Sequence, residues 1–153
     1  MARILIGFAS MSGNTEEMAD LIKERLEEDH EIHMDELEEI EPGFLMDFDA
    51  VILGSYTWND GDLPYEVEDF YEDLEDIDLT GKGIAVFGSG DTSYPQFCEA
   101  VHTFEERLTA VGGERMTGAW KVDMHPDNEE DIEHIQRFTD EVMEHLGHLL
   151  QLK

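Results

Sequence analysis

Residues 4–15 read ILIGFASMSGNT, an apolar run followed by a turn rich in hydroxyl groups. The run is almost continuous rather than alternating, which is typical of a strand covered on both faces, as in a parallel sheet. Residues 51–53 and 84–87 have the same character and are also bounded by turn residues. We therefore expect three buried strands at the centre of one sheet.

Apolar residues recur at helical spacing in the segments between and after these strands. The helical pattern covers residues 18–26, 67–74, 97–111 and 132–149. Weaker strand patterns cover residues 30–35, which are polar enough for a sheet edge, and residues 115–122. Around Leu45 we expect an irregular turn in place of a helix.

Strands and helices thus alternate along the whole chain, which predicts an α/β fold with a doubly wound parallel sheet. We find no internal repeat, low-complexity linker or domain boundary within residues 1–153. A chain of 153 residues has the length of about one domain, so a single domain is expected.

The composition is strongly acidic, with 39 Asp and Glu against 9 Lys and Arg and a formal net charge of −30. Nucleic-acid binding needs a basic footprint, and an anionic membrane surface repels such a chain, so neither partner is expected. No apolar run approaches the ~18 residues of a membrane span, and the first strand pattern begins at Ile4, which leaves no place for a signal peptide. We therefore expect a cytoplasmic protein.

Metal and disulfide chemistry are not indicated by the residue types. The single cysteine, Cys98, excludes an intrachain disulfide and a multi-cysteine metal site, and it is expected to be a buried apolar residue. His134, His145 and His148 are expected on the solvated face of the last helix, so no metal site is predicted.

In a doubly wound sheet, ligands bind beyond the carboxyl ends of the strands, where the strand order reverses. Function is therefore expected in the loops at residues 9–15, 55–64 and 88–98. The first loop offers three hydroxyl groups, an amide and a glycine just before a helix N-terminus, which makes an anion cradle of neutral donors. It has no lysine and no G-x-G-x-x-G, so it is neither a nucleoside-triphosphate loop nor a dinucleotide fingerprint.

A plainer interpretation of the first loop is helix capping by Asn14 or Thr15. The other two loops favour a ligand, because each carries an aromatic residue that a core does not explain, Trp58 in one and Tyr94 in the other. Gly88 and Gly90 are expected to let the backbone approach that ligand closely. A phosphate cradle facing two aromatic rings predicts a pocket for a flat, phosphorylated ring.

These motifs resemble the flavodoxins, and the resemblance extends over essentially the whole chain. It is most specific in residues 10–15, in Tyr56-Thr57-Trp58 and in the GSGDTSY segment at 88–94. Residues 115–123 are too few for the insertion of the long-chain members, so the chain is similar to the short-chain type. The resemblance implies a five-stranded sheet in the order 2-1-3-4-5 with helices on both faces.

The resemblance also implies FMN, bound without covalent attachment, and a monomeric one-electron carrier between reductases and acceptor enzymes rather than an enzyme with its own substrate. It assigns the phosphate to Ser10, Ser12, Asn14 and Thr15, the ring faces to Trp58 and Tyr94, and the ring's polar edge to the backbone of Asn59 through Asp62 and of Asp91. The residues expected at the cofactor are Ser10, Met11, Ser12, Gly13, Asn14, Thr15, Ser55, Tyr56, Thr57, Trp58, Asn59, Asp60, Gly61, Ser89, Gly90, Asp91, Tyr94, Phe97 and Cys98.

Charge affects both the electron and the partner. At ~12 Å in water, each carboxylate raises the energy of an added negative charge by roughly 0.3 kcal/mol, so many carboxylates make a low-potential carrier. A partner with a basic face is expected at the acidic rim that includes Asp60, Asp62 and Glu66.

Two other functions are considered. An NAD(P)H-dependent quinone or flavin reductase of related fold is disfavoured, because there is no dinucleotide fingerprint and only 9 basic residues are present to meet a 2′-phosphate. An interaction domain without flavin would leave Trp58 and Tyr94 without a purpose.

Overall fold

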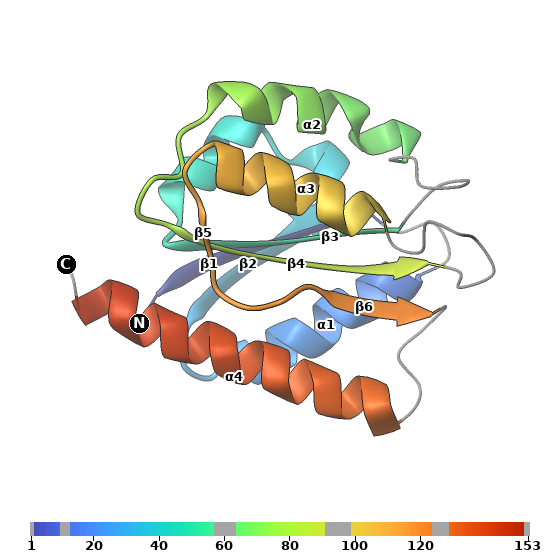
Figure 1. The fold of residues 1–153 in the computed structure, drawn as a ribbon, viewed down its shortest axis with the longest axis vertical. Coiled ribbons are helices and arrows are strands. Elements are labelled where there is room, and N and C mark those ends of the chain that lie inside the picture. Colours follow the sequence, from blue (N-terminus) through green and yellow to red (C-terminus); the bar gives the residue numbers. More distant parts are fainter. Residues whose placement is uncertain (1, 10–12, 57–63, 91–98, 124–128, 152–153) are drawn as a thin grey trace.

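The computed structural model describes residues 2–9, 13–56, 64–90, 99–123 and 129–151 (Figure 1). Its sheet is parallel throughout and has the order β2-β1-β3-β4-β5, with β6 also paired to β4. The strands are β1 (Arg3–Ala9), β2 (Glu31–Glu36), β3 (Ala50–Tyr56), β4 (Gly83–Gly90), β5 (Glu114–Arg115) and β6 (Trp120–Asp123). The predicted fold class and strand order are confirmed.

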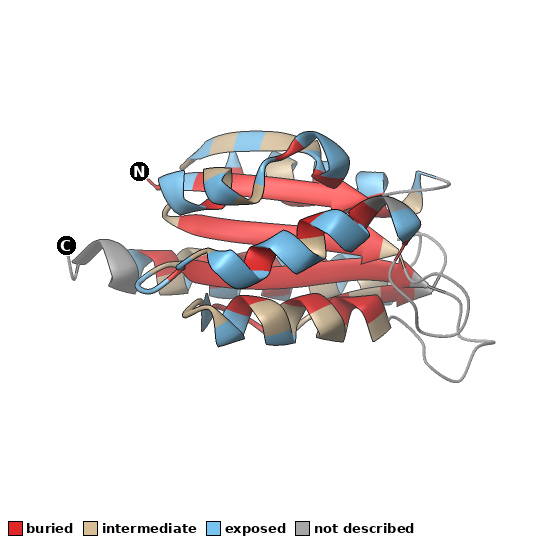
Figure 2. Ribbon diagram, turned by 90° about the horizontal axis from the view of Figure 1, so that it is seen from above, coloured by how far each residue is buried: buried red, intermediate tan, exposed pale blue. Residues whose placement is uncertain are grey.

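Helices cover both faces of the sheet. One face carries α1 (Asn14–Leu26) and α4 (Glu129–Gln151), and the other carries α2 (Glu68–Asp73) and α3 (Glu99–Ala110) (Figure 1). Successive residues of β1 alternate between the two sides: Ile4 and Ile6 join the apolar cluster under α1 and α4, whereas Leu5 joins the one under α2 and α3. Figure 2 shows the central strands buried along their length, as the continuous apolar runs predict.

The connection after β2 contains the short 3₁₀ turns η1 (Leu37–Glu39) and η2 (Pro42–Asp47), in agreement with the irregular turn expected around Leu45. The helix expected at 67–74 is also broken into short pieces, because α2 lies between the 3₁₀ turns η3 (Tyr65–Val67) and η4 (Leu74–Asp76). Among the described residues, no helix combines the length and the apolar character that crossing a membrane requires.

The strand expected at 115–122 is wrong in its middle part. β4 advances three residues from Ile84 to Phe87, whereas the edge strand advances five from Arg115 to Trp120, so two extra residues leave the ladder. Thr117 lies in this interruption, and its buried hydroxyl donates to the carboxylate of Glu141 on α4. Residues 116–119 are apolar enough to look like a continuous strand, and the sequence pattern does not reveal this bond to α4.

Gly88 has a packing role that differs from the ligand approach expected for it. A Cβ atom at this position would lie 2.3 Å from Cγ2 of Val101 on α3 and 2.4 Å from the carbonyl oxygen of Ser55 on β3. Glycine therefore allows α3 and β3 to pack closely against the end of β4. Side chains larger than a hydrogen atom are excluded at this point.

We expect Gly88→Ala to lower the free energy of unfolding by about 1–3 kcal/mol, because the added methyl group meets backbone that cannot turn away. Gly147→Ala is the matched control, since Gly147 is exposed on α4 and a Cβ there has nothing within 4 Å. This control should gain up to about 1 kcal/mol from its higher helix propensity. Urea unfolding of both variants measures the difference, and equal stabilities would contradict the packing argument.

Candidate functional site

The loops predicted to bind a ligand begin at adjacent points on one edge of the sheet. At the carboxyl ends of the strands, Ala9 of β1 is paired with Ser55 of β3, and Tyr56 of β3 is paired with Ser89 of β4. In the order β2-β1-β3-β4, the chain adds β2 on one side of β1 and then adds β3 and β4 on the other side. The order in which strands are added therefore reverses between β1 and β3. This edge is therefore the position at which a doubly wound sheet binds its ligand.

The start of α1 depends on Gly13. This residue is the N-cap and has φ of 90°, a left-handed conformation that glycine adopts without strain. Asn14 and Thr15 lie inside the first turn and not at the cap, so the plainer interpretation of both as capping residues is wrong. Their side chains are left for other partners.

Thr15 and Ser89 meet at the centre of this edge. The hydroxyl oxygens Oγ1 of Thr15 and Oγ of Ser89 are 2.8 Å apart, although 74 residues separate them along the chain. Thr15 is fully buried and Ser89 is 4% exposed, so water does not compete for the bond. The first and third predicted loops are thus joined by a buried hydrogen bond.

The beginning of the second loop is also fixed by the fold. Ser55 is buried, and its hydroxyl donates to the carbonyl of Tyr56 at 2.8 Å. Tyr56 is half-buried and packs against the apolar cluster under α2 and α3. For Gly90 the structure gives the backbone, which pairs with Asp123 of β6.

The other residues expected at the cofactor lie outside the described residues, and the structure does not place them. They are Ser10, Met11 and Ser12 in the first loop, Thr57, Trp58, Asn59, Asp60, Gly61 and Asp62 in the second, and Asp91, Tyr94, Phe97 and Cys98 in the third.

Negative charge gathers along the segment that follows the second loop. Its exposed acids, which we call the acidic ridge, are Glu68, Asp69, Glu72, Asp73, Glu75 and Asp76. Tyr65, at the start of this segment, is 84% exposed. Sequence reasoning did not single out Tyr65, but a signal was present, because the helical pattern at 67, 70, 71 and 74 leaves position 65 off the apolar face.

Two cations on α3 and β6 have partners within the chain. The guanidinium of Arg107 lies 4.4 Å from the ring centre of Tyr71 and 3.7 Å from a carboxylate oxygen of Glu75. A hydrogen bond with the Tyr71 side chain raises the pKa of Arg107, so this group stays charged. Lys121 on β6 lies 3.2 Å from Nε2 of His102 on α3. The acidic ridge therefore keeps most of its negative charge.

No metal centre is formed by the parts of the chain that the structure describes, where no three His, Cys, Asp or Glu side chains come together. The expectation that the histidines of α4 lie on its solvated face is wrong for His134 and His145, and the side chain of His148 lies outside what the structure describes. His145 is partly buried with its Nε2 3.5 Å from a carboxylate oxygen of Glu114, and His134 is also partly buried.

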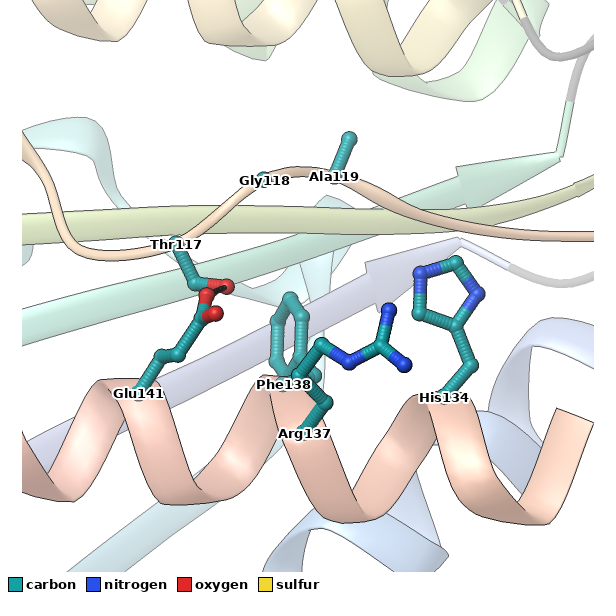
Figure 3. A pocket seen from close by; sticks show the side chains of 7 residues that line it. All are labelled: Thr117, Gly118, Ala119, His134, Arg137, Phe138 and Glu141. Atoms are coloured by element: carbon teal, nitrogen blue, oxygen red, sulfur yellow. Dashed lines mark hydrogen bonds between the residues drawn. The ribbon is translucent and has the colours of Figure 1, made fainter.

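A small groove of about 220 Å³ lies between α4 and the interruption in the edge strand (Figure 3). His134, Arg137 and Phe138 line it from α4, and Figure 3 shows the carboxylate of Glu141 next to the Thr117 hydroxyl. None of its lining residues comes from the three predicted loops. The groove is therefore separate from the edge at which Thr15 meets Ser89.

The sheet order, the turn before α1 and the joined loop ends define a protein of the flavodoxin-like fold class. The flavodoxin family model matches residues 6–138. The chain therefore belongs to the flavodoxin family, whose members are electron-transfer proteins rather than enzymes that turn over a substrate. The strand order 2-1-3-4-5 with a site at the β1/β3 reversal is the arrangement for which flavodoxin itself is the standard example.

Individual relatives agree with this assignment. Probable flavodoxin 1 of Bacillus subtilis is 46% identical over 141 residues, which cover 91% of this chain and 89% of the relative. The crystal structure of oxidised flavodoxin 2 from Bacillus cereus matches with a TM-score of 0.90 and 53% identity over 94% of this chain and 99% of that one. A Fusobacterium nucleatum flavodoxin bound to flavin mononucleotide has a TM-score of 0.76 over 97% and 99% of the two chains, and at 18% identity it shows a shared fold.

Proposed function

We propose that this chain is a low-potential one-electron carrier that holds FMN non-covalently at the carboxyl edge of β1, β3 and β4. The observation that carries the proposal is the buried Thr15–Ser89 bond, which joins the end of the anion cradle to the start of the loop expected at the flavin ring. FMN, when bound, supplies the one-electron redox chemistry. The alternative of an NAD(P)H-dependent reductase is not favoured by membership of the flavodoxin family.

The described residues fit a phosphate group. The first turn of α1 presents backbone N–H groups that have no partner within the helix, together with the positive end of the helix dipole. Its acidic side chains, Glu16 and Glu17, are exposed and thus directed away from the core. The neutral amide of Asn14 and the hydroxyl of Thr15 lie in the same turn.

The flavodoxin motifs of the sequence assign the residues that would hold FMN. Ser10, Ser12, Asn14 and Thr15 would donate to the phosphate, with the backbone of Met11 and Gly13. Trp58 and Tyr94 would exclude water from the two faces of the ring, because a flat apolar ring is buried best between aromatic side chains. Backbone groups from Asn59 to Asp62 and at Asp91 would bond the polar edge of the ring. Ser55, Tyr56, Thr57, Gly90, Phe97 and Cys98 would complete the pocket, and Ser89 would support it through its bond to Thr15.

The acidic ridge supports a partner of opposite charge. A reductase or acceptor enzyme with a basic face would be steered to the ridge and to the acids expected at Asp60, Asp62 and Glu66. Exposed Tyr65 lies in the same segment and offers an apolar contact for a brief encounter. We propose a cytoplasmic monomer in which residues 1–153 act as a single domain, without a nucleic-acid or membrane partner.

A carrier and a reductase differ in their reaction with nicotinamide nucleotides. We expect the FMN-loaded protein alone to oxidise NADPH or NADH no faster than free FMN does, because the chain has no dinucleotide fingerprint. Adding a flavodoxin reductase with a basic face should make electron flow depend on this protein. The measurement is absorbance at the nicotinamide band with a quinone as the final acceptor. Steady turnover without a reductase would favour the enzyme alternative.

A further inference from the structure

The hydroxyl pair of Thr15 and Ser89 is held by rigid elements on both sides. Phe87 packs in the cluster under α1 and α4, so Ser89, two residues further along β4, faces the same helices. Its backbone is paired with Tyr56 on one side and with Val122 on the other. Thr15 is fixed by the first turn of α1. The two oxygens therefore meet by construction of the fold and not by chance contact of mobile side chains.

The number of hydrogens that each hydroxyl can donate fixes the direction of the Thr15–Ser89 hydrogen bond when an anion is present. Each hydroxyl has one hydrogen to donate and two lone pairs that accept. Thr15 can donate its hydrogen to a phosphate oxygen only if it does not donate to Ser89. The Ser89 hydrogen must then point to Thr15 Oγ1, and this donation makes the Thr15 hydroxyl a stronger donor.

We propose that Ser89 is a positioning residue for the phosphate group, which acts by donating to Thr15 and does not touch the ligand itself. This inference rests on the proposed function. It places Thr15 between Ser89 and the phosphate of the cofactor. The Ser89 hydroxyl bonds Thr15 at 2.8 Å, and its one hydrogen is used in that bond, so its effect passes through Thr15. Ser89 is followed directly by Gly90, the last residue of β4. Ser89 therefore links the phosphate end of the site to the rest of the third loop.

Riboflavin separates this role from a merely structural one, because it carries the same ring as FMN and no phosphate. We expect Ser89→Ala to weaken FMN binding to the flavin-free protein by about tenfold, the effect of losing one hydrogen bond to a charged network. Riboflavin binding should change less than twofold. Ser89→Cys, which keeps the shape of the side chain with a larger atom and retains a weak donor, should lie between wild type and Ser89→Ala for FMN.

The coupling with Thr15 is tested in the same titrations of flavin fluorescence. Thr15→Val should weaken FMN binding at least as much as Ser89→Ala, and the double variant should be no worse than Thr15→Val alone, because Ser89 acts only through Thr15. Thr117→Val is the matched control. It removes another buried hydroxyl, bonded to Glu141 outside the site, and should leave both flavin affinities unchanged.

Each outcome decides the point. Equal losses of FMN and riboflavin in Ser89→Ala, or additive losses in the double variant, would overturn the positioning role. If Ser89→Ala does not fold, the FMN-to-riboflavin ratio of Ser89→Cys makes the same decision. A wild-type protein that binds neither flavin would refute the proposed function instead, and that result is distinct from all of these.

Discussion

Raising the ionic strength from 0.01 M to 1 M should increase the melting temperature of this protein by on the order of 10 °C. The chain carries a net charge of −30, and two like charges ~10 Å apart in water repel by roughly 0.4 kcal/mol. The screening length shortens from ~30 Å to ~3 Å over this range, so most of the repulsion in the folded state is removed. A gain of about 3 kcal/mol in unfolding free energy corresponds to such a shift in a domain of this size.

The arginines show why salt should not act in the opposite direction by breaking ion pairs. Arg3–Glu31, Arg25–Asp140 and Arg115–Glu105 join partners of which at least one is well exposed, with N–O distances of 3.3–3.7 Å. Exposed pairs contribute about 0–1 kcal/mol each, so their loss is smaller than the relief of repulsion.

A charge variant tests this cause of the stabilisation. Replacing three acids of the ridge by amides (Glu68→Gln, Asp69→Asn and Glu72→Gln) should raise the melting temperature at low salt and make its salt dependence shallower. Calorimetry measures both effects. Sodium chloride is the salt to use, because it is less strongly excluded from protein surfaces than sulfate and so reports mainly on screening. A melting temperature that stays flat from low to molar salt would contradict the repulsion argument.

The rate of reduction by a basic-faced reductase should change in the other direction and fall at least tenfold between 0.01 M and 1 M salt. Electrostatic steering concentrates the partner at the acidic ridge, and salt screens this attraction. Electron transfer requires a brief encounter, so the association step carries the salt dependence. The protein would therefore become more stable and react more slowly under the same conditions.

The position of the charges distinguishes local docking from the effect of net charge. The ridge variant should lower the low-salt rate by about threefold to tenfold. A matched variant with the same charge change, Glu27→Gln, Glu28→Gln and Asp29→Asn, alters exposed acids just before β2, at the amino edge of the sheet. It should change the rate much less. Equal stopped-flow rates for the two variants, or a salt-independent rate, would rule out docking at the ridge.

Most of the fold follows from short-range patterns. The sequence predicts the three central strands at residues 4–8, 51–53 and 84–87, because burial on both faces selects continuous apolar runs. It also predicts the strand at 30–35, whose more polar residues are typical of a sheet edge. The interruption between β5 and β6 was not predictable, since the Thr117–Glu141 bond that accompanies it joins residues 24 positions apart. Sequence periodicity reports exposure and contains no information on such long-range bonds.

The site shows the same limit. The hydroxyl groups, the amide and the glycine of residues 10–15 are local features and indicate an anion cradle from the sequence, and the structure shows that Gly13 is left-handed. The role of Ser89 could not be read in the same way, because it depends on β4 lying under the first turn of α1. The sequence predicts close approach of a ligand at Gly88, and the contacts of a Cβ with Val101 and Ser55 add a packing role that the pattern does not indicate.

The most direct test of the proposed function is a redox titration of the purified protein. The protein is first saturated with FMN, and its visible spectrum is recorded during the titration. We expect a yellow protein with one FMN per chain, released intact by acid, that takes up electrons in two separated one-electron steps. The second step should occur at low potential, because the added charge is placed in a chain with a net charge of −30. A colourless protein that ignores added FMN, or a single two-electron step, would contradict a one-electron carrier.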